Sequence, residues 1–104
     1  MLDHQLQLAA DTYLPVTENV LPTGELAAVA DTPFDFTTAR SLGERIDSDD
    51  AQLSIGSGYD HNFVARPACR DLSVPFAVVT DPNSGRVLEL FTDSPGVQLY
   101  SGNF

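Results

Sequence analysis

Hydrophobic and polar residues alternate along much of the chain with a period of two. Between residues 2 and 10, the apolar residues Leu2, Leu6, Leu8 and Ala10 lie in one register, and Asp3, Gln5 and Gln7 lie in the other. His4 is the one polar residue in that register, and we interpret it as a packed or surface residue of a strand. Successive side chains of a strand point to opposite faces of a sheet, so this pattern predicts a half-buried strand.

The second half of the chain predicts a hairpin. Residues 74–80 and 86–92 are rich in β-branched and aromatic side chains, and a five-residue loop that ends in Gly85 joins them. Longer hairpin connections often end in this way. A further turn at 93–96 leads into an alternating run at 97–100. Short strands separated by turn signals at such intervals predict an antiparallel sandwich.

One segment alone, residues 41–46, predicts a helix. Ser41 and Glu44 have the spacing of a capping box, in which each side chain bonds the other residue's backbone N–H. Gly43 lies inside the segment and weakens it, so we expect one or two turns at most. The predicted fold class is therefore all-β, with antiparallel strands and at most one short helix near 41–46.

Charge excludes two classes of partner. Fifteen carboxylates face five arginines and no lysine, which gives a net charge of −10. A nucleic-acid-binding protein needs clustered basic residues to neutralise phosphates, and an anionic membrane surface would repel this chain. The longest apolar run is far shorter than the ~20 residues of a membrane span, and the first residues lack the features of a secretory signal. We expect a cytoplasmic protein that binds neither nucleic acid nor membrane.

Conventional catalytic and metal-binding signatures are also missing from the sequence. There is no nucleophile elbow and no zinc-binding helix motif, and two histidines with one cysteine make a metal site hard to build. The acidic run at 47–50 lacks the ligand order of a calcium loop, and Cys69 has no second cysteine to pair with. We therefore expect no cofactor and no metal.

One polar cluster, residues 56–63, stands in a β-like context. Its glycines allow close approach to the backbone, and Asp60 and Asn62 share one face of an extended segment. Alternating hydrogen-bond donors and acceptors of this kind suit a polyol. Gly, Asp and Asn are also the residues of an ordinary turn, so the pattern alone leaves both interpretations open.

Sequence motifs then point to a family. Residues 58–63 (GYDHNF) resemble the G-[YF]-D-H-[NA]-F segment of the galactose mutarotase, or aldose 1-epimerase, family. Residues 95–104 (PGVQLYSGNF) are similar to its P-G-[VL]-Q-[FL]-Y-[ST]-G-N-F strand, and 84–92 to its S-G-R-V-L-E-V-[YF]-T hairpin arm. Residues 10–18 and 21–25 match its A-D-x-Y-L-P-V-x-E and [LI]-P-T-G-E stretches, in the same order. The resemblance covers essentially the whole chain.

The resemblance implies a galactose mutarotase-like β-sandwich and two sugar-binding residues. Asp60 falls on the family's sugar-binding aspartate, which would accept hydrogen bonds from ring hydroxyls. Gln98 falls on its pocket glutamine, which could both donate and accept. In the family a Glu takes the proton of the C1 hydroxyl while a His protonates the ring oxygen. The motifs of that His and that Glu are not found here, and neither His4 nor His61 aligns with the catalytic His, so we expect no catalytic residue.

Two functional hypotheses follow. In the first, residues 1–104 are the central portion of an aldose 1-epimerase domain whose N-terminal and C-terminal parts are missing. They would carry part of the surface that binds an aldohexose such as glucose or galactose, and would be inactive alone. In the second, the chain is a non-catalytic β module that binds a carbohydrate or a partner chain. In the first case, strand edges left without neighbours predict self-association, whereas a compact monomer would favour the second.

Overall fold

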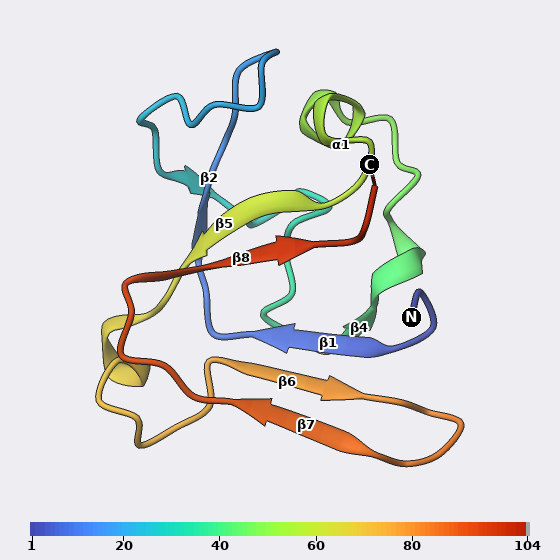
Figure 1. Ribbon diagram of the computed structural model, residues 1–104, viewed down its shortest axis with the longest axis vertical. Helices are drawn as coiled ribbons and strands as arrows, with labels where there is room; N and C mark the ends of the chain where they lie inside the picture. The colour runs from blue at the N-terminus through green and yellow to red at the C-terminus, as the bar shows by residue number, and fades with distance from the viewer. Residues whose placement is uncertain (104) are drawn as a thin grey trace.

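Two antiparallel sheets of four strands each make up the structure, a computed structural model that describes residues 1–103 (Figure 1). The first sheet has the order β4-β1-β6-β7 and contains β1 (Gln5–Leu8), β4 (Arg40–Ser41), β6 (Ala77–Thr80) and β7 (Val87–Leu90). The second has the order β3-β2-β5-β8 and contains β2 (Thr12–Leu14), β3 (Ala27–Ala28), β5 (Asp60–Val64) and β8 (Gly96–Tyr100). Every pair of neighbouring strands is antiparallel, which confirms the predicted fold class. Phe104, the last residue of the 95–104 motif, lies outside the described residues.

The predicted alternation appears directly in the burial of the strands. In β1, Leu6 and Leu8 are buried while the two glutamines beside them are exposed. The strand is shorter than the alternating run, because residues 2–4 form a turn and a bend before it. His4 lies there half-exposed, and its Nε2 atom is 3.9 Å from the Asp81 carboxylate. The first-strand prediction is therefore confirmed at its centre and too long at its start.

An aromatic cluster packs the loop between β3 and β4 against the second sheet. The Tyr13 ring of β2 stacks on Phe34 with a centroid distance of 4.3 Å, and Tyr59 meets Phe34 edge-on at 5.6 Å. Phe34 and Phe36 belong to the loop between β3 and β4 and are fully buried, as is Phe63 of β5. Aromatic pairs in these geometries contribute about 0.5–1.5 kcal/mol beyond their area burial, so this loop is fixed although it has no regular structure.

The α-helix of the structure does not lie in the segment 41–46, where the sequence predicted a helix. Residues 41–46 contain one 3-10 turn at Leu42–Glu44, and the Ser41 side chain forms no capping hydrogen bond within the described residues. Arg45 provides the reason, since its guanidinium donates hydrogen bonds to the carbonyl oxygens of Thr32 and Asp35, at 2.8 and 2.6 Å. These tertiary contacts outweigh the local preference for a helix.

The α-helix of the structure, α1 (Ala51–Gly56), instead follows the acidic run. Asp50 is its N-cap, and its Oδ1 atom accepts the backbone N–H groups of Gln52 and Leu53 at 2.8 and 3.2 Å. Ser57 ends the helix in the left-handed conformation, with φ of 57°. The run at 47–50, which lacks the ligand order of a calcium loop, thus supplies a helix cap. With six residues, α1 is far shorter than the ~20 residues of a membrane span, and the described residues contain no candidate membrane-spanning helix.

The predicted hairpin forms between β6 and β7. The backbone N–H of Asp81 donates to Arg86 O at 2.9 Å, and that of Gly85 donates to Asp81 O at 2.8 Å. Gly85 has φ of 76°, a conformation that favours glycine. Strand β7 lies at the edge of its sheet and is exposed on both faces. Figure 1 shows the hairpin extending along one side of the molecule with β7 outermost.

Candidate functional site

The two residues that the family resemblance singled out lie together on neighbouring strands. Antiparallel pairing of β5 with β8 sets Asn62 opposite Gln98 and Asp60 opposite Tyr100. Alternate residues of a strand share a face, so Asp60, Asn62 and Gln98 lie on the same face of the sheet. The Gln98 Nε2 atom donates a hydrogen bond to Asp60 Oδ1 at 3.0 Å. The structure thus joins Asp60 and Gln98 in one polar cluster, although 38 residues separate them.

A hollow of about 290 Å³ opens beside this cluster. Its walls combine the polar residues Asp60, Asn62 and Gln98 with the apolar residues Leu14, Val16, Val20 and Pro22. The apolar residues come from the end of β2 and the loop that joins β2 to β3 (Figure 1). A small-molecule site typically has an apolar lining with a few polar groups that fix the ligand's orientation. The hollow has this composition, and its volume lies near the lower end of the usual ~300–1,000 Å³.

Gly96 makes room for the polar cluster. A Cβ atom at this position would overlap the Oδ1 atom of Asn62 and would lie 3.2 Å from the backbone oxygen of Phe63. The Asn62 side chain therefore occupies the space that any larger residue would need. Sequence reasoning missed this role, although a glycine at the start of a predicted strand is a known sign of close approach.

His61 lies on the opposite face of β5 and is fully buried. Its ring meets those of Phe34 and Tyr13 edge-on, at centroid distances of 4.7 and 5.9 Å. The Nδ1 atom accepts the backbone N–H of Asp60 at 3.2 Å, so the ring proton is assigned to Nε2. Burial lowers the pKa of His61, against the opposing effect of the Asp60 and Asp50 carboxylates. His61 is thus a neutral core residue on the face of β5 opposite Asp60.

The Gln52 side chain of α1 contacts the backbone of Val16, one of the residues that line the hollow. Its Oε1 atom accepts the backbone N–H of Val16 at 2.8 Å, and its Nε2 atom donates to Val16 O at 3.1 Å. Oε1 also lies 3.2 Å from His61 Nε2. No local sequence pattern indicates this contact, because 36 residues separate Gln52 from Val16.

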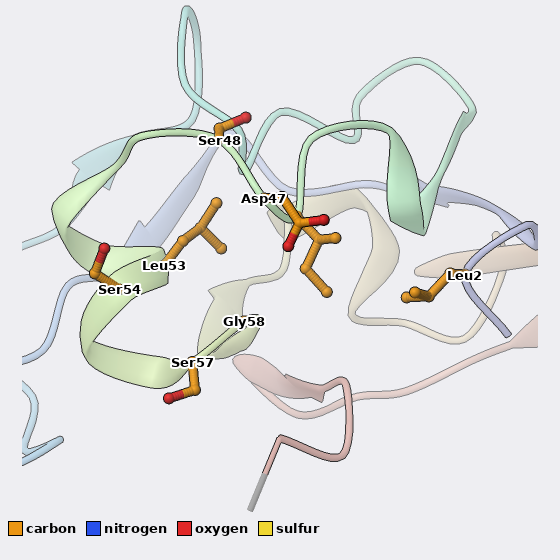
Figure 2. Close-up of a pocket in the computed structure, with 8 residues that line it drawn as sticks. Leu2, Asp47, Ser48, Leu53, Ser54, Ser57 and Gly58 are labelled. Carbon is orange, nitrogen blue, oxygen red and sulfur yellow. The ribbon is translucent and has the colours of Figure 1, made fainter.

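A second hollow, of about 380 Å³, lies between α1, the acidic run and the start of the chain (Figure 2). Figure 2 shows Ser54 and Ser57 on its helix side and Leu2 on the opposite side. Neither Asp60 nor Gln98 lines it. Among residues 1–103 there is no group of three His, Cys, Asp or Glu side chains placed to hold a metal ion. Cys69 is buried with a free thiol.

Comparison with known proteins extends the motif evidence to the whole chain. The family model described as aldose 1-epimerase matches residues 1–104. The chain belongs to the aldose 1-epimerase family. The expected family membership is thereby confirmed.

Relatives within the aldose 1-epimerase family cover nearly all of this chain. It is 44% identical over 102 residues to the galactose mutarotase of Homo sapiens, a match that covers 98% of this chain and 28% of the human protein. It is 39% identical to the aldose 1-epimerase of Escherichia coli strain K12, with 98% and 29% covered. The crystal structure of galactose 1-epimerase from Lactobacillus acidophilus NCFM superposes with a TM-score of 0.87 at 36% identity, and covers 98% of this chain and 29% of that one. This aldose 1-epimerase family chain therefore spans less than a third of the length of these relatives.

Proposed function

We propose that the chain binds the ring of an aldohexose, such as galactose or glucose, in the hollow beside Asp60 and Gln98. The observation that carries this proposal is the hydrogen-bonded Asp60–Gln98 pair facing an apolar wall. A pyranose ring presents hydroxyl groups at its edge and C–H groups on its faces, so it needs both kinds of surface. Relatives named galactose mutarotase and aldose 1-epimerase support the choice of sugar as ligand.

Each polar residue has a distinct part in recognition. The Asp60 carboxylate has about four acceptor positions, and the hydrogen bond from Gln98 uses one of them. It can therefore accept hydrogen bonds from sugar hydroxyls while Gln98 holds it in place. The Gln98 amide can both donate and accept, and Asn62 adds a second amide on the same wall. The apolar wall at Leu14 and Val16 would cover a C–H face of the ring.

The reaction to which this surface would contribute is interconversion of the α and β anomers of the sugar. A base removes the proton of the C1 hydroxyl and an acid protonates the ring oxygen. The C1–O5 bond then breaks, the aldehyde rotates about C1–C2, and the ring closes on its other face. Asp60 and Gln98 would orient the ring during these steps. We propose that the chain forms part of an aldose 1-epimerase domain and acts in the cytoplasm.

We propose that neither histidine of this chain acts as the acid. Among residues 1–103, His61 is fully buried with a hydrogen-bond partner at each ring nitrogen. His4 precedes β1 in the other sheet, next to Asp81. A positioned proton-transfer group contributes about 10²–10⁴-fold to a rate, so we propose that residues 1–104 alone do not accelerate mutarotation. Polarimetry of galactose with and without the purified chain measures this, and a clear rate enhancement would overturn the assignment.

A second candidate function is a non-catalytic module that binds carbohydrate without turning it over. The position of both histidines away from the hollow favours it. The two candidates share the binding step and differ only in the reaction. Sugar binding by this chain, with no rate enhancement from a longer protein that contains it, would support the module and contradict the epimerase.

Sugar binding is tested by a galactose titration followed in ¹⁵N-labelled protein by NMR. We expect the amides of Asp60, Asn62 and Gln98 to shift. Asp60→Ala or Gln98→Ala should weaken binding about 2- to 100-fold, with the larger effect at the charged residue. Glu89→Ala on the exposed strand β7 is the matched control and should bind like the parent. Absence of any shift in the parent protein would refute the proposed function.

A further inference from the structure

Val16, which belongs to the apolar wall of the hollow, is hydrogen-bonded by the Gln52 side chain. Val16 lies just beyond β2, where its bridge partner is Pro22. On its other side the Gln52 side chain donates to Val16 O and accepts from its N–H, at 3.1 and 2.8 Å. In an antiparallel sheet, a residue of the neighbouring strand bonds both the N–H and the C=O of its partner in the same way. One side chain therefore fixes the backbone position of this wall.

The same side chain reaches the polar wall through His61. Gln52 Oε1 has two lone pairs, one used by Val16 N–H and the other by the Nε2–H of His61. The opposite ring nitrogen of His61 accepts the backbone N–H of Asp60. A single path of hydrogen bonds thus runs from Val16 through Gln52 and His61 to Asp60. Its two ends are the two sides of the hollow.

Helix α1 gives Gln52 a fixed base. Asp50 caps the first turn, and the backbone N–H of Gly58 donates to Leu53 O at 2.9 Å beyond the last turn. Leu53 is buried in the core, and the side chain of Asn103 donates to Gly56 O at 3.0 Å. Both ends of the helix are therefore tied down. A displacement of Gln52 relative to β5 would require several of these contacts to break.

We propose that Gln52 is a positioning residue that sets the separation between Val16 and Asp60, the apolar and acceptor sides of the hollow. This inference rests on the proposed binding of an aldohexose there. Gln52 does not contact the sugar; it keeps the two walls in their binding arrangement before the sugar arrives. Such preorganisation strengthens binding because less ordering is required when the complex forms.

The test compares two substitutions of Gln52 with one control. Gln52→Met keeps the length of the side chain and removes its hydrogen bonds. Gln52→Glu keeps the acceptor for Val16 N–H and His61, and places a second oxygen against Val16 O. Gln5→Met makes the same chemical change as Gln52→Met on the exposed face of β1. Amide exchange at Leu6, in the other sheet, reports whether each variant is folded.

The first measurement is hydrogen exchange of the Val16 amide without sugar. We expect exchange to accelerate about tenfold in Gln52→Met, less in Gln52→Glu, and not in Gln5→Met. The ¹⁵N spectrum of the His61 ring should also change in Gln52→Met, because Nε2–H loses its acceptor. If Gln52 acted through packing alone, Val16 exchange would be as fast in Gln52→Glu as in Gln52→Met, or faster. Unchanged Val16 exchange in Gln52→Met would overturn the proposal.

The second measurement is the galactose titration of the same proteins. We expect both Gln52 variants to bind about 3- to 30-fold more weakly, while the sites of the shifts, Asp60 and Gln98, remain the same. Affinity equal to that of the parent protein would overturn the role of Gln52. A parent protein that does not respond to galactose would instead refute the proposed function. In that case Val16 exchange alone decides whether Gln52 holds the wall.

Discussion

At the scale of single residues, the site depends on the space that a side chain leaves free. Gly96, the first residue of β8, packs against the Asn62 side chain, and an alanine Cβ at this position would overlap Asn62 Oδ1. Val20, on the rim of the hollow, has φ of 62°, which is uncommon for a β-branched residue. Close approach and backbone strain thus occur together around Asp60. Both kinds of feature are often found at functional sites.

Gly96→Ala should lower the free energy of unfolding by about 1–3 kcal/mol, because either Asn62 or strand β8 must move. Urea unfolding measures the change. The Asn62→Ala background is the control, since it removes the oxygen that the new methyl group would meet. We expect Gly96→Ala to cost less in that background, and the difference is the coupling between the two positions. Equal costs in both backgrounds would show that Asn62 is not the obstacle.

The buried His61 makes stability depend on pH. Its pKa is lowered by burial in the folded protein, so the unfolded chain takes up a proton near pH 6.5 while the native protein does not. Stability is therefore fully present above pH 6.5 and falls as pH drops, until the folded pKa is reached. Asp11 and Asp35, whose pKa values are lowered by hydrogen bonds from Arg66 and Thr37, lose their contributions in a separate, more acidic range.

Urea unfolding between pH 8 and pH 5 checks this expectation. The parent protein should lose stability with falling pH, and His61→Gln should show a flatter dependence over the same range. His4→Gln changes the half-exposed histidine outside the core and is the matched control. An identical slope in the parent protein and His61→Gln would contradict the assignment.

At the scale of elements, local pattern predicted the strands better than the helix. Alternation located β1, and the loop that ends in Gly85 located the hairpin. Helix α1 has six residues, too few for a 3.6-residue period to emerge from a hydrophobic pattern. Its cap, Asp50, stood in an acidic run that reads as a solvated loop. The stronger local signal, the capping box at Ser41, was overridden by the contacts of Arg45 with the loop before β4.

Capping by Asp50 predicts a selective effect of substitution. Asp50→Ala should lower the free energy of unfolding by about 0.5–2 kcal/mol, because two backbone N–H groups of α1 lose their acceptor. Asp49→Ala removes the same charge one residue earlier, at an exposed position, and should be nearly neutral. Ser41→Ala should also be nearly neutral. Thermal unfolding compares the three variants, and a larger effect at Ser41 than at Asp50 would restore the capping box.

At the scale of the whole molecule, the cluster of Asp60, Asn62 and Gln98 depends on the order of the strands in the sheet, which no local sequence pattern predicts. The face shared by Asp60 and Asn62 follows from alternation within β5. Their meeting with Gln98 follows from the pairing of β5 with β8 across the intervening hairpin, and here the family motifs supplied the link. The apolar wall at Val16 and its support by Gln52 required the complete structure. Contacts between distant segments are set by packing of the core, which a single sequence does not display.

The exposed strand β7 predicts self-association. Val87 and Leu88 are 56% and 61% exposed, and the outer edge of the strand offers backbone N–H and C=O groups to another chain. We expect sedimentation to show concentration-dependent oligomers that strengthen with salt, because salt screens the net charge of −10. Leu88→Lys should weaken association. Leu72→Lys, which changes an exposed leucine outside the strands, is the control. A compact monomer at all concentrations would contradict this use of β7.

The alternation of side chains in β5 also limits which mutations the chain can tolerate during evolution. Its inward residues, His61 and Phe63, belong to the core, and its outward residues, Asp60 and Asn62, belong to the hollow. A single inserted or deleted codon would exchange these two sets, because side chains alternate strictly along a strand. The lining of the hollow can therefore change by point substitution in β5, whereas changes of length should accumulate in the loop between β2 and β3. Descendants of this gene should differ in the length of that loop long before they differ in the length of β5.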